Sequence, residues 1–194
     1  MALADGLMVA QRPASSHAGF SLAEVLLVVA LAAVLLGYTV IAFQSTAASI
    51  QGDANVRIVE QQLKLARDTA AAQRRSVEVR FVPPNQLLVI RRDLPAGTTQ
   101  LQSAVLENNT TFFRFPGVPD TPDTFGGAGA LNFGGAPVVM FTADGMFVDA
   151  AGTPVNGTVY LGQEGKPFTQ RALTIFGSTA RIRTYRWNGT LWGN

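Results

Sequence analysis

The sequence predicts an α+β fold in which one long N-terminal helix packs against a small antiparallel β head. Two changes of hydrophobic pattern lead to this prediction. An almost wholly apolar run near the N-terminus passes into a segment whose apolar residues recur every three or four positions, as on one face of a helix. After residue 73 the period falls to two, which is typical of strands with one buried face.

The first half of the predicted helix, residues 20–45, has the properties of a transmembrane segment. No charged residue occurs from Val25 to Gly52, and the run from Val25 to Phe43 is almost all apolar. In a helix this run spans about 28 Å, which matches the hydrocarbon thickness of a bilayer. A soluble core helix of this length needs a polar face, and this one has almost none.

The second half of the helix, residues 46–73, is amphipathic. Its apolar residues form a stripe of Val56, Val59, Leu63, Ala66 and Ala70, and the opposite face carries Arg57, Gln61, Lys64 and Asp68. Glu60 and Lys64, four residues apart, add support to the helix. A helix from Phe20 to about Ala72 would be roughly 80 Å long, with its stripe buried against the head.

The head, residues 74–194, has the pattern of antiparallel β structure. Val77–Val82 alternates, Pro83-Pro84-Asn85 makes a turn, and Leu87–Ile90 resumes the alternation, as in a hairpin. Further strands are expected at Leu101–Leu106, Thr111–Phe115, Val138–Thr142, Thr158–Leu161, Ala172–Phe176 and Ala180–Trp187. Residues 116–137 are rich in glycine and proline and are expected to form a long, potentially mobile loop.

Composition excludes several classes of catalytic site. The chain has no cysteine, which rules out disulfides, thiol nucleophiles and cysteine-based metal sites. Its only histidine, His17, precedes the apolar run. Removal of residues 1–19 would therefore also exclude Ser-His-Asp catalysis and most transition-metal sites. We expect no catalytic residues, no cofactor and no metal, in a protein that is not an enzyme.

Charge is distributed unevenly, although the net charge is only +2. From Glu107 to Glu164 the charged residues are acidic except for Arg114, and after Glu164 they are all basic. This asymmetry indicates two surfaces with different partners.

A processing motif precedes the apolar run. The sequence Gly19-Phe20-Ser21-Leu22-Ala23-Glu24 places a small residue, an aromatic residue and a carboxylate in fixed register with it. This resembles the class III signal of type IV pilins and type II secretion pseudopilins. The resemblance implies that prepilin peptidase removes residues 1–19 as a leader by cutting between Gly19 and Phe20, and that the new N-terminus on Phe20 is methylated.

The resemblance also implies a role for Glu24 in assembly. A carboxylate inside an apolar helix is costly unless it finds a partner, and the α-amino group of Phe20 in a neighbouring subunit would supply the opposite charge. Two plainer interpretations are open: a simple membrane anchor with Glu24 at the interface, and a secretory signal cut near Ala47-Ala48. Against the second, the leader is poor in bases and the apolar run is long.

The head resembles the GspH/FimT family. The resemblance rests on Val138–Gly145, Gly157–Leu161 and Arg171–Ile175, which are looser than the N-terminal motif. It implies the pilin fold, as found in minor pilins and H-type pseudopilins, which help to start filament assembly at or near the tip. Major pilins usually carry a proline near the twenty-second mature position, and Ile41 stands here instead, which favours a minor pilin or a pseudopilin.

The C-terminal strand is basic. Arg181, Arg183 and Tyr185 are expected on one face, and Ile182, Thr184 and Arg186 on the other. Some FimT-like proteins are linked to DNA uptake through a Gly-Arg-x-Arg element, which here reads Ala180-Arg181-Ile182-Arg183. The resemblance makes Arg181, Arg183 and Arg186 candidate DNA-binding residues, but alanine replaces the glycine of the turn. The alternative is that the arginines only keep this strand soluble and unpaired.

The function expected from these patterns is that of a minor pilin, which joins a type IV pilus near its tip and helps to initiate it. An H-type pseudopilin of a type II secretion system shares every feature, and a DNA-binding minor pilin is a third interpretation. Expected partners are other pilin or pseudopilin subunits, prepilin peptidase, the inner membrane and, in the third interpretation, DNA. The chain is expected to cross the bacterial inner membrane once, with its head in the periplasm, before it enters a pilus or pseudopilus.

Overall fold

The computed structural model describes residues 20–193, except for the side chains of residues 40–45. Within these residues one helix, α1 (Leu22–Gln73), is followed by ten strands. The strands are β1 (Val77–Val82), β2 (Gln86–Arg92), β3 (Thr98–Val105), β4 (Leu131–Asn132), β5 (Val139–Phe141), β6 (Phe147–Asp149), β7 (Gly157–Gln163), β8 (Lys166–Ile175), β9 (Ile182–Trp187) and β10 (Trp192–Gly193). The chain divides after Ile41 into two compact units, of which the second is Ala42–Asn194.

The side chains of α1 from Leu22 to Thr39, in the first unit, are all exposed. From Leu22 to Thr39 its mean hydropathy is 2.3, and none of this window is buried. By length and composition the segment is able to cross a membrane. Among the described residues nothing covers its apolar surface.

The second unit is built on the predicted stripe of α1. All five stripe residues, from Val56 to Ala70, are buried. The opposite face is exposed, and Lys64 Nζ lies 2.7 Å from Glu60 Oε1. The helical period of the sequence is confirmed here, and it decides which face of α1 meets the head.

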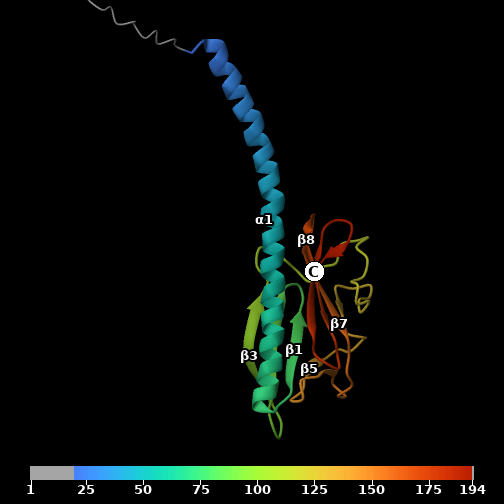
Figure 1. Ribbon diagram of the computed structural model, residues 1–194. Helices are drawn as coiled ribbons and strands as arrows, with labels where there is room; N and C mark the ends of the chain where they lie inside the picture. The colour runs from blue at the N-terminus through green and yellow to red at the C-terminus, as the bar shows by residue number, and fades with distance from the viewer. Residues whose placement is uncertain (1–19, 194) are drawn as a thin grey trace, which may run out of the picture. The chain divides into compact units, whose positions relative to one another are not determined.

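Two five-stranded antiparallel sheets complete the second unit. The first has the order β3-β2-β1-β5-β6, and the second has the order β10-β9-β8-β7-β4. Val79 from the first sheet and Leu173 from the second share one buried core with the stripe of α1. In Figure 1, β3 and β1 are seen on either side of the C-terminal part of α1, and β7 and β8 belong to the second sheet. A long helix packed against an antiparallel β head is the fold class that the sequence predicts.

Most of the predicted strands are present, but the strand predicted at Thr111–Phe115 is not formed. Thr111 makes only an isolated bridge to Gly162. The neighbouring stretch of β7 pairs instead with β4. Because two segments share one edge of β7, neither extends into a long strand.

Three strands are missing from the sequence prediction, namely β4, β6 and β10. Each has only two or three residues, and so short a segment shows no readable period. β4 lies inside the segment 116–137 that is expected to be a loop. A turn at Asp144-Gly145 joins β5 to β6, with Gly145 at a φ of 78°.

Candidate functional site

The N-terminus of α1 is closed by a reciprocal pair of hydrogen bonds. The backbone N–H of Ser21 donates to Glu24 Oε2 at 3.0 Å, and the backbone N–H of Glu24 donates to Ser21 Oγ at 3.2 Å. This is a capping box, which satisfies two of the N–H groups that a helix start leaves without partners. The Ser-x-x-Glu spacing is the sequence signal of this capping box. The prediction from the sequence assigns Glu24 a role in assembly only and misses its role as a helix cap.

The capping box also fixes the position of the Glu24 carboxylate. With Phe20, Val25, Val28 and Val29, Glu24 lines a shallow apolar hollow. Phe20 is 86% exposed. Within residues 20–193 no hydrogen bond engages Glu24 Oε1. Gly19, the other residue of the predicted cleavage site, lies outside the described residues.

Arg171 of β8 anchors the head to α1. It is 1% exposed, and its Nε donates to Asp53 Oδ1 at 2.6 Å. Nη2 donates to the Ser49 carbonyl at 2.8 Å and to Ser49 Oγ at 3.0 Å. Nη1 donates to the carbonyls of Phe168 and Gln170, each at 2.9 Å. All five N–H donors of the guanidinium are thereby used.

This anchor needs close contact between α1 and β8. A Cβ atom built on Gly52 would lie 2.7 Å from the Thr169 carbonyl oxygen and 3.1 Å from Arg171 Cζ. Only glycine leaves that space free. Burial lowers the pKa of Arg171 from its ordinary value, and the Asp53 carboxylate opposes this change. The ion pair and the hydrogen bonds therefore offset part of the cost of the buried charge.

A buried amide extends the anchor along the helix. Asn55 is fully buried, and its Nδ2 donates to the Glu107 carbonyl at 3.2 Å and to Thr110 Oγ1 at 3.0 Å. Its Oδ1 accepts the backbone N–H of Glu107 at 2.7 Å. Gln163 of β7 reaches α1 through Gln51 Oε1 at 3.1 Å. Because buried polar groups are costly unless bonded, these bonds hold α1 in one register against the head.

Two of the three candidate DNA-binding arginines have acidic partners inside the chain. Arg183 Nη1 donates to Asp123 Oδ1 at 2.6 Å. Arg186 Nη1 lies 3.9 Å from Asp53 Oδ2. Arg181 is exposed, and no ion pair engages it within residues 20–193. Asp123 therefore balances the charge of Arg183, whereas Asp53 already pairs with Arg171 and balances the exposed Arg186 only in part.

The partners of these arginines come from segments far away in the sequence. Asp123 lies in the acidic stretch and accepts hydrogen bonds from Thr174, Arg183 and Tyr185. The same contacts place Arg183 and Tyr185 on one face of β9, as the strand period predicts. At these positions the charge asymmetry of the sequence does not produce two surfaces with separate partners, because the acidic and basic stretches pair with each other.

The turn before β9 forms with alanine in place of glycine. Ala180 has a φ of 48° and is fully buried. The backbone N–H of Phe176 donates to the Arg181 carbonyl at 2.9 Å and closes the turn. A left-handed conformation costs a residue with a Cβ atom about 1–2 kcal/mol, and the burial of Ala180 offsets part of this cost. The doubt that the sequence raised about this turn is thus resolved.

Segment 116–137 lies against the second sheet. The Tyr160 hydroxyl of β7 donates to Asp120 Oδ1 at 2.6 Å. Trp192 Nε1 of β10 donates to the Pro119 carbonyl at 3.0 Å. Together with the bonds of Asp123, these contacts hold the segment over the face of the sheet that carries Tyr160 and Tyr185.

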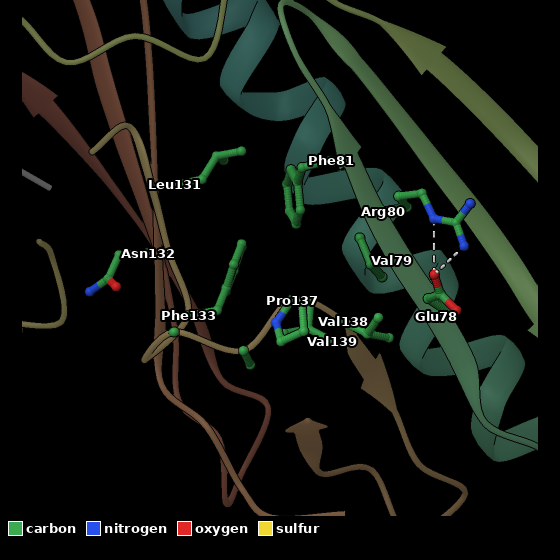
Figure 2. Close-up of a pocket in the computed structure, with 12 residues that line it drawn as sticks. Glu78, Val79, Arg80, Phe81, Leu131, Asn132, Phe133, Pro137, Val138 and Val139 are labelled. Carbon is green, nitrogen blue, oxygen red and sulfur yellow. Dashed lines mark hydrogen bonds and ion pairs between the residues drawn. The ribbon is translucent and has the colours of Figure 1, made fainter. Parts of the chain in front are cut away.

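A hollow of about 310 Å³ opens between the two sheets. Its lining combines apolar side chains, among them Phe81, Leu131, Phe133 and Pro137, with polar groups (Figure 2). The rings of Phe81 and Phe133 are stacked, with centroids 5.1 Å apart. At its rim Arg80 Nη2 donates to Glu78 Oε1 at 2.7 Å. Within residues 20–193 no group of three histidines or acidic residues is placed to hold a metal.

Comparisons with known proteins yield structural likenesses alone. No family model and no curated protein matches the chain. The minor pseudopilin EpsH from the type 2 secretion system of Vibrio cholerae is similar at 14% identity and a TM-score of 0.48, over 70% of this chain and 97% of that chain. The type IV minor pilin FimU of Pseudomonas aeruginosa is similar in one crystal form at 17% identity and a TM-score of 0.45, over 78% of this chain and 93% of that chain. At such TM-scores the likenesses carry no argument of their own, so the function has to be argued from the residues of this chain.

The Arg171 anchor leads to a first prediction. We expect Arg171→Met to destabilise the head by about 3 kcal/mol, the lower end of the range for a broken buried ion pair, because Asp53 is 37% exposed and can turn to water. The midpoint of urea unfolding of the detergent-solubilised chain measures this loss. Arg186→Met is the matched control, since Arg186 is 57% exposed beside the same carboxylate and surface pairs contribute little. Equal losses in the two variants would contradict the anchor.

A second prediction concerns Asp123 and pH. Burial opposes ionisation of its carboxyl, but hydrogen bonds from Thr174 and Tyr185 and the charge of Arg183 outweigh it and hold the pKa below the ordinary 3.8. Because the pKa of Asp123 is lower in the folded state than in the unfolded state, its ionised carboxylate stabilises the fold at pH values above the unfolded-state pKa. This stabilisation is lost as the pH falls through the folded-state pKa. We expect Asp123→Asn to lower the Tm at neutral pH, and the gap to the wild type to narrow below about pH 4.

Thermal unfolding between neutral pH and about pH 2.5 tests this expectation. Asp144→Asn, in the exposed turn between β5 and β6, is the control and should follow the wild type. A gap between Asp123→Asn and the wild type that stays constant over the whole range would show that the charge of Asp123 plays no part.

Proposed function

We propose that this chain is a minor pilin, a non-enzymatic and membrane-anchored subunit that joins a type IV pilus near its tip and helps to initiate it. The observation that carries the proposal is the form of α1. One continuous helix begins at a capped carboxylate, exposes an apolar surface over Leu22–Thr39, and then buries a single stripe in a β head. An apolar helix without a cover of its own is suited to exchange lipid for the helices of neighbouring subunits.

The proposal includes cleavage between Gly19 and Phe20 and methylation of Phe20. Cleavage would remove the polar leader and create a cationic amine next to the helix start. In a neighbouring subunit that amine has an acceptor in Glu24 Oε1, while Glu24 Oε2 stays in the capping box. An ion pair between subunits would remove the cost of a lone carboxylate among apolar helices, so it favours assembly in register.

Mass spectrometry of the N-terminus, on protein purified from its native host, tests the processing step. We expect the mature chain to begin at Phe20, with or without a methyl group. A Gly19→Leu variant is the control and should retain Met1, because a bulky side chain blocks extended backbone at the cleavage site. An intact Met1 in the wild type, or a cut near Ala48, would overturn the proposal.

A pair of variants separates assembly from helix capping. Glutamine can replace glutamate in a capping box, so Glu24→Gln should keep the helix start and lose the charge that assembly needs. We expect it to deplete the subunit from sheared filaments, as measured by immunoblot. Ser21→Ala removes the cap, at about 0.5–2 kcal/mol, and keeps the charge. It should speed amide exchange at residues 22–25 and retain more incorporation than Glu24→Gln. Normal incorporation of Glu24→Gln would rule out the charge pair.

The nearest alternative of the same class is an H-type pseudopilin of a type II secretion system. It would use the same helix, leader and Glu24. Neighbouring genes separate the two systems, because a secretin encoded with secretion genes indicates a pseudopilus. Twitching or competence genes indicate a pilus.

A narrower hypothesis is DNA binding during uptake. Arg181 is its best candidate, because Arg183 is held by Asp123 and Arg186 lies beside Asp53. Phosphate contacts weaken as salt rises. We expect Arg181→Ala to reduce salt-sensitive DNA binding by the detergent-solubilised chain more than Arg183→Ala does. If the Arg181→Ala/Arg183→Ala double variant bound DNA with wild-type affinity, this strand would be excluded as a DNA site.

A further inference from the structure

β3 is an open edge of the first sheet. It comes first in the order β3-β2-β1-β5-β6, so one side of its backbone pairs with β2, and no strand within residues 20–193 lies on the other side. Seven of its eight residues are exposed, and the other is half-buried. Such an edge presents a row of backbone N–H and C=O groups to any extended chain that approaches it.

The devices that usually protect an edge are nearly absent at β3. No charged residue occurs from Leu94 to Leu106, and the strand itself has neither lysine nor proline. Val105 is 52% exposed. One β-bulge is present at Leu101, which has no partner in β2 because Val89 pairs with Gln102 and Ile90 pairs with Gln100. It leaves Gln102–Val105 in an unbroken ladder with β2, so part of the edge stays regular.

The other sheet edges of the described chain offer no comparable site. β6 has three residues, and Val148 in its middle already bridges to Pro154. β4 and β10, at the two ends of the second sheet, have two residues each. β10 leaves Ile182–Tyr185 of β9 without a strand on its outer side, so β3, with eight residues, is the longest open edge within residues 20–193.

We infer that β3 binds an extended, uncharged segment of another protein, which adds to the first sheet as a sixth strand. Backbone hydrogen bonds would give most of the affinity. The side chains of Thr98, Thr99, Gln100, Gln102 and Ser103 carry no charge. They therefore favour hydroxyl, amide and β-branched neighbours across the new strand pair.

A second copy of this chain fits the edge less well. In Figure 1 β3 runs along the direction of the neighbouring part of α1. A two-fold antiparallel pair of β3 strands would therefore point the two helices in opposite directions. Subunits anchored in one membrane have parallel helices, so such a pair does not suit them. The exclusion of a second copy is the one step that rests on the proposed function.

A synthetic peptide with the sequence of residues 98–105, labelled outside the strand with a fluorophore, is a suitable probe. Only alternate N–H groups of an added strand face β3. Two peptides therefore form a matched pair: one is N-methylated at its odd positions and the other at its even positions, and only one of them loses the N–H groups that face β3. We expect the parent and one N-methylated peptide to bind the detergent-solubilised full chain saturably, by fluorescence anisotropy. The other N-methylated peptide should bind at least about tenfold more weakly, because its donors are lost.

Hydrogen exchange then locates the bound peptide. Amides of β3 should exchange more slowly when the peptide is present, while those of β7 should not change. Equal weakening by both N-methylated peptides, or protection outside β3, would overturn the inference. A dimer mass by light scattering, with β3 protected in the absence of peptide, would assign the edge to a second copy instead. None of these outcomes alters the N-terminus at Phe20, so the two proposals fail independently.

Discussion

The guanidinium of Arg171 is the contact on which the arrangement of the head depends. Apolar burial alone is not directional, and a stripe of valine, leucine and alanine would allow α1 to shift along the sheets. A buried guanidinium is demanding, because each of its five donors needs an acceptor at a fixed place. Asp53 and Ser49 supply three of these acceptors on α1. The helix is thus held in one register, and Gly52 and Asn55 are fitted around that register.

The two parts of α1 are specialised in opposite ways. In the second unit, the apolar stripe of α1 is buried in the head and the amide of Asn55 is hydrogen-bonded there. The apolar side chains of Leu22–Thr39 remain uncovered, and the hydrogen bonds of this segment stay within the capping box and the helix itself. The proposed function follows from this difference, because an unsatisfied apolar helix seeks partners outside its own chain. Glu24 adds one polar requirement to an otherwise apolar surface, and that requirement favours one register of assembly.

The C-terminal strand shows why charge counted along a sequence is a weak guide to charge on a surface. Asp123 takes up the charge of Arg183, and its segment packs over the aromatic face of the second sheet. The carboxylate serves the packing of segment 116–137 and also reduces the field of the basic strand. Any DNA-binding role then falls mainly on Arg181, which stands outside this network.

Local features of this protein were predictable from the sequence, because neighbours along the chain decide them. The stripe from Val56 to Ala70, the β1–β2 hairpin and the turn at Asp144-Gly145 each follow from period or turn chemistry within a few residues. The Ser21–Glu24 capping box belongs to the same class and was readable from its spacing.

Contacts between distant segments were decided only by the tertiary structure. Arg171 and Asp53 are 118 residues apart, and Arg183 and Asp123 are 60 apart. No periodicity of the sequence links such residues, so the sequence does not distinguish the buried Arg171 from an arginine on the surface. The competition of two segments for one edge of β7, which removed the strand at Thr111–Phe115, is of the same kind. A strand needs a free neighbour as well as a suitable sequence, and only the fold determines which neighbours are free.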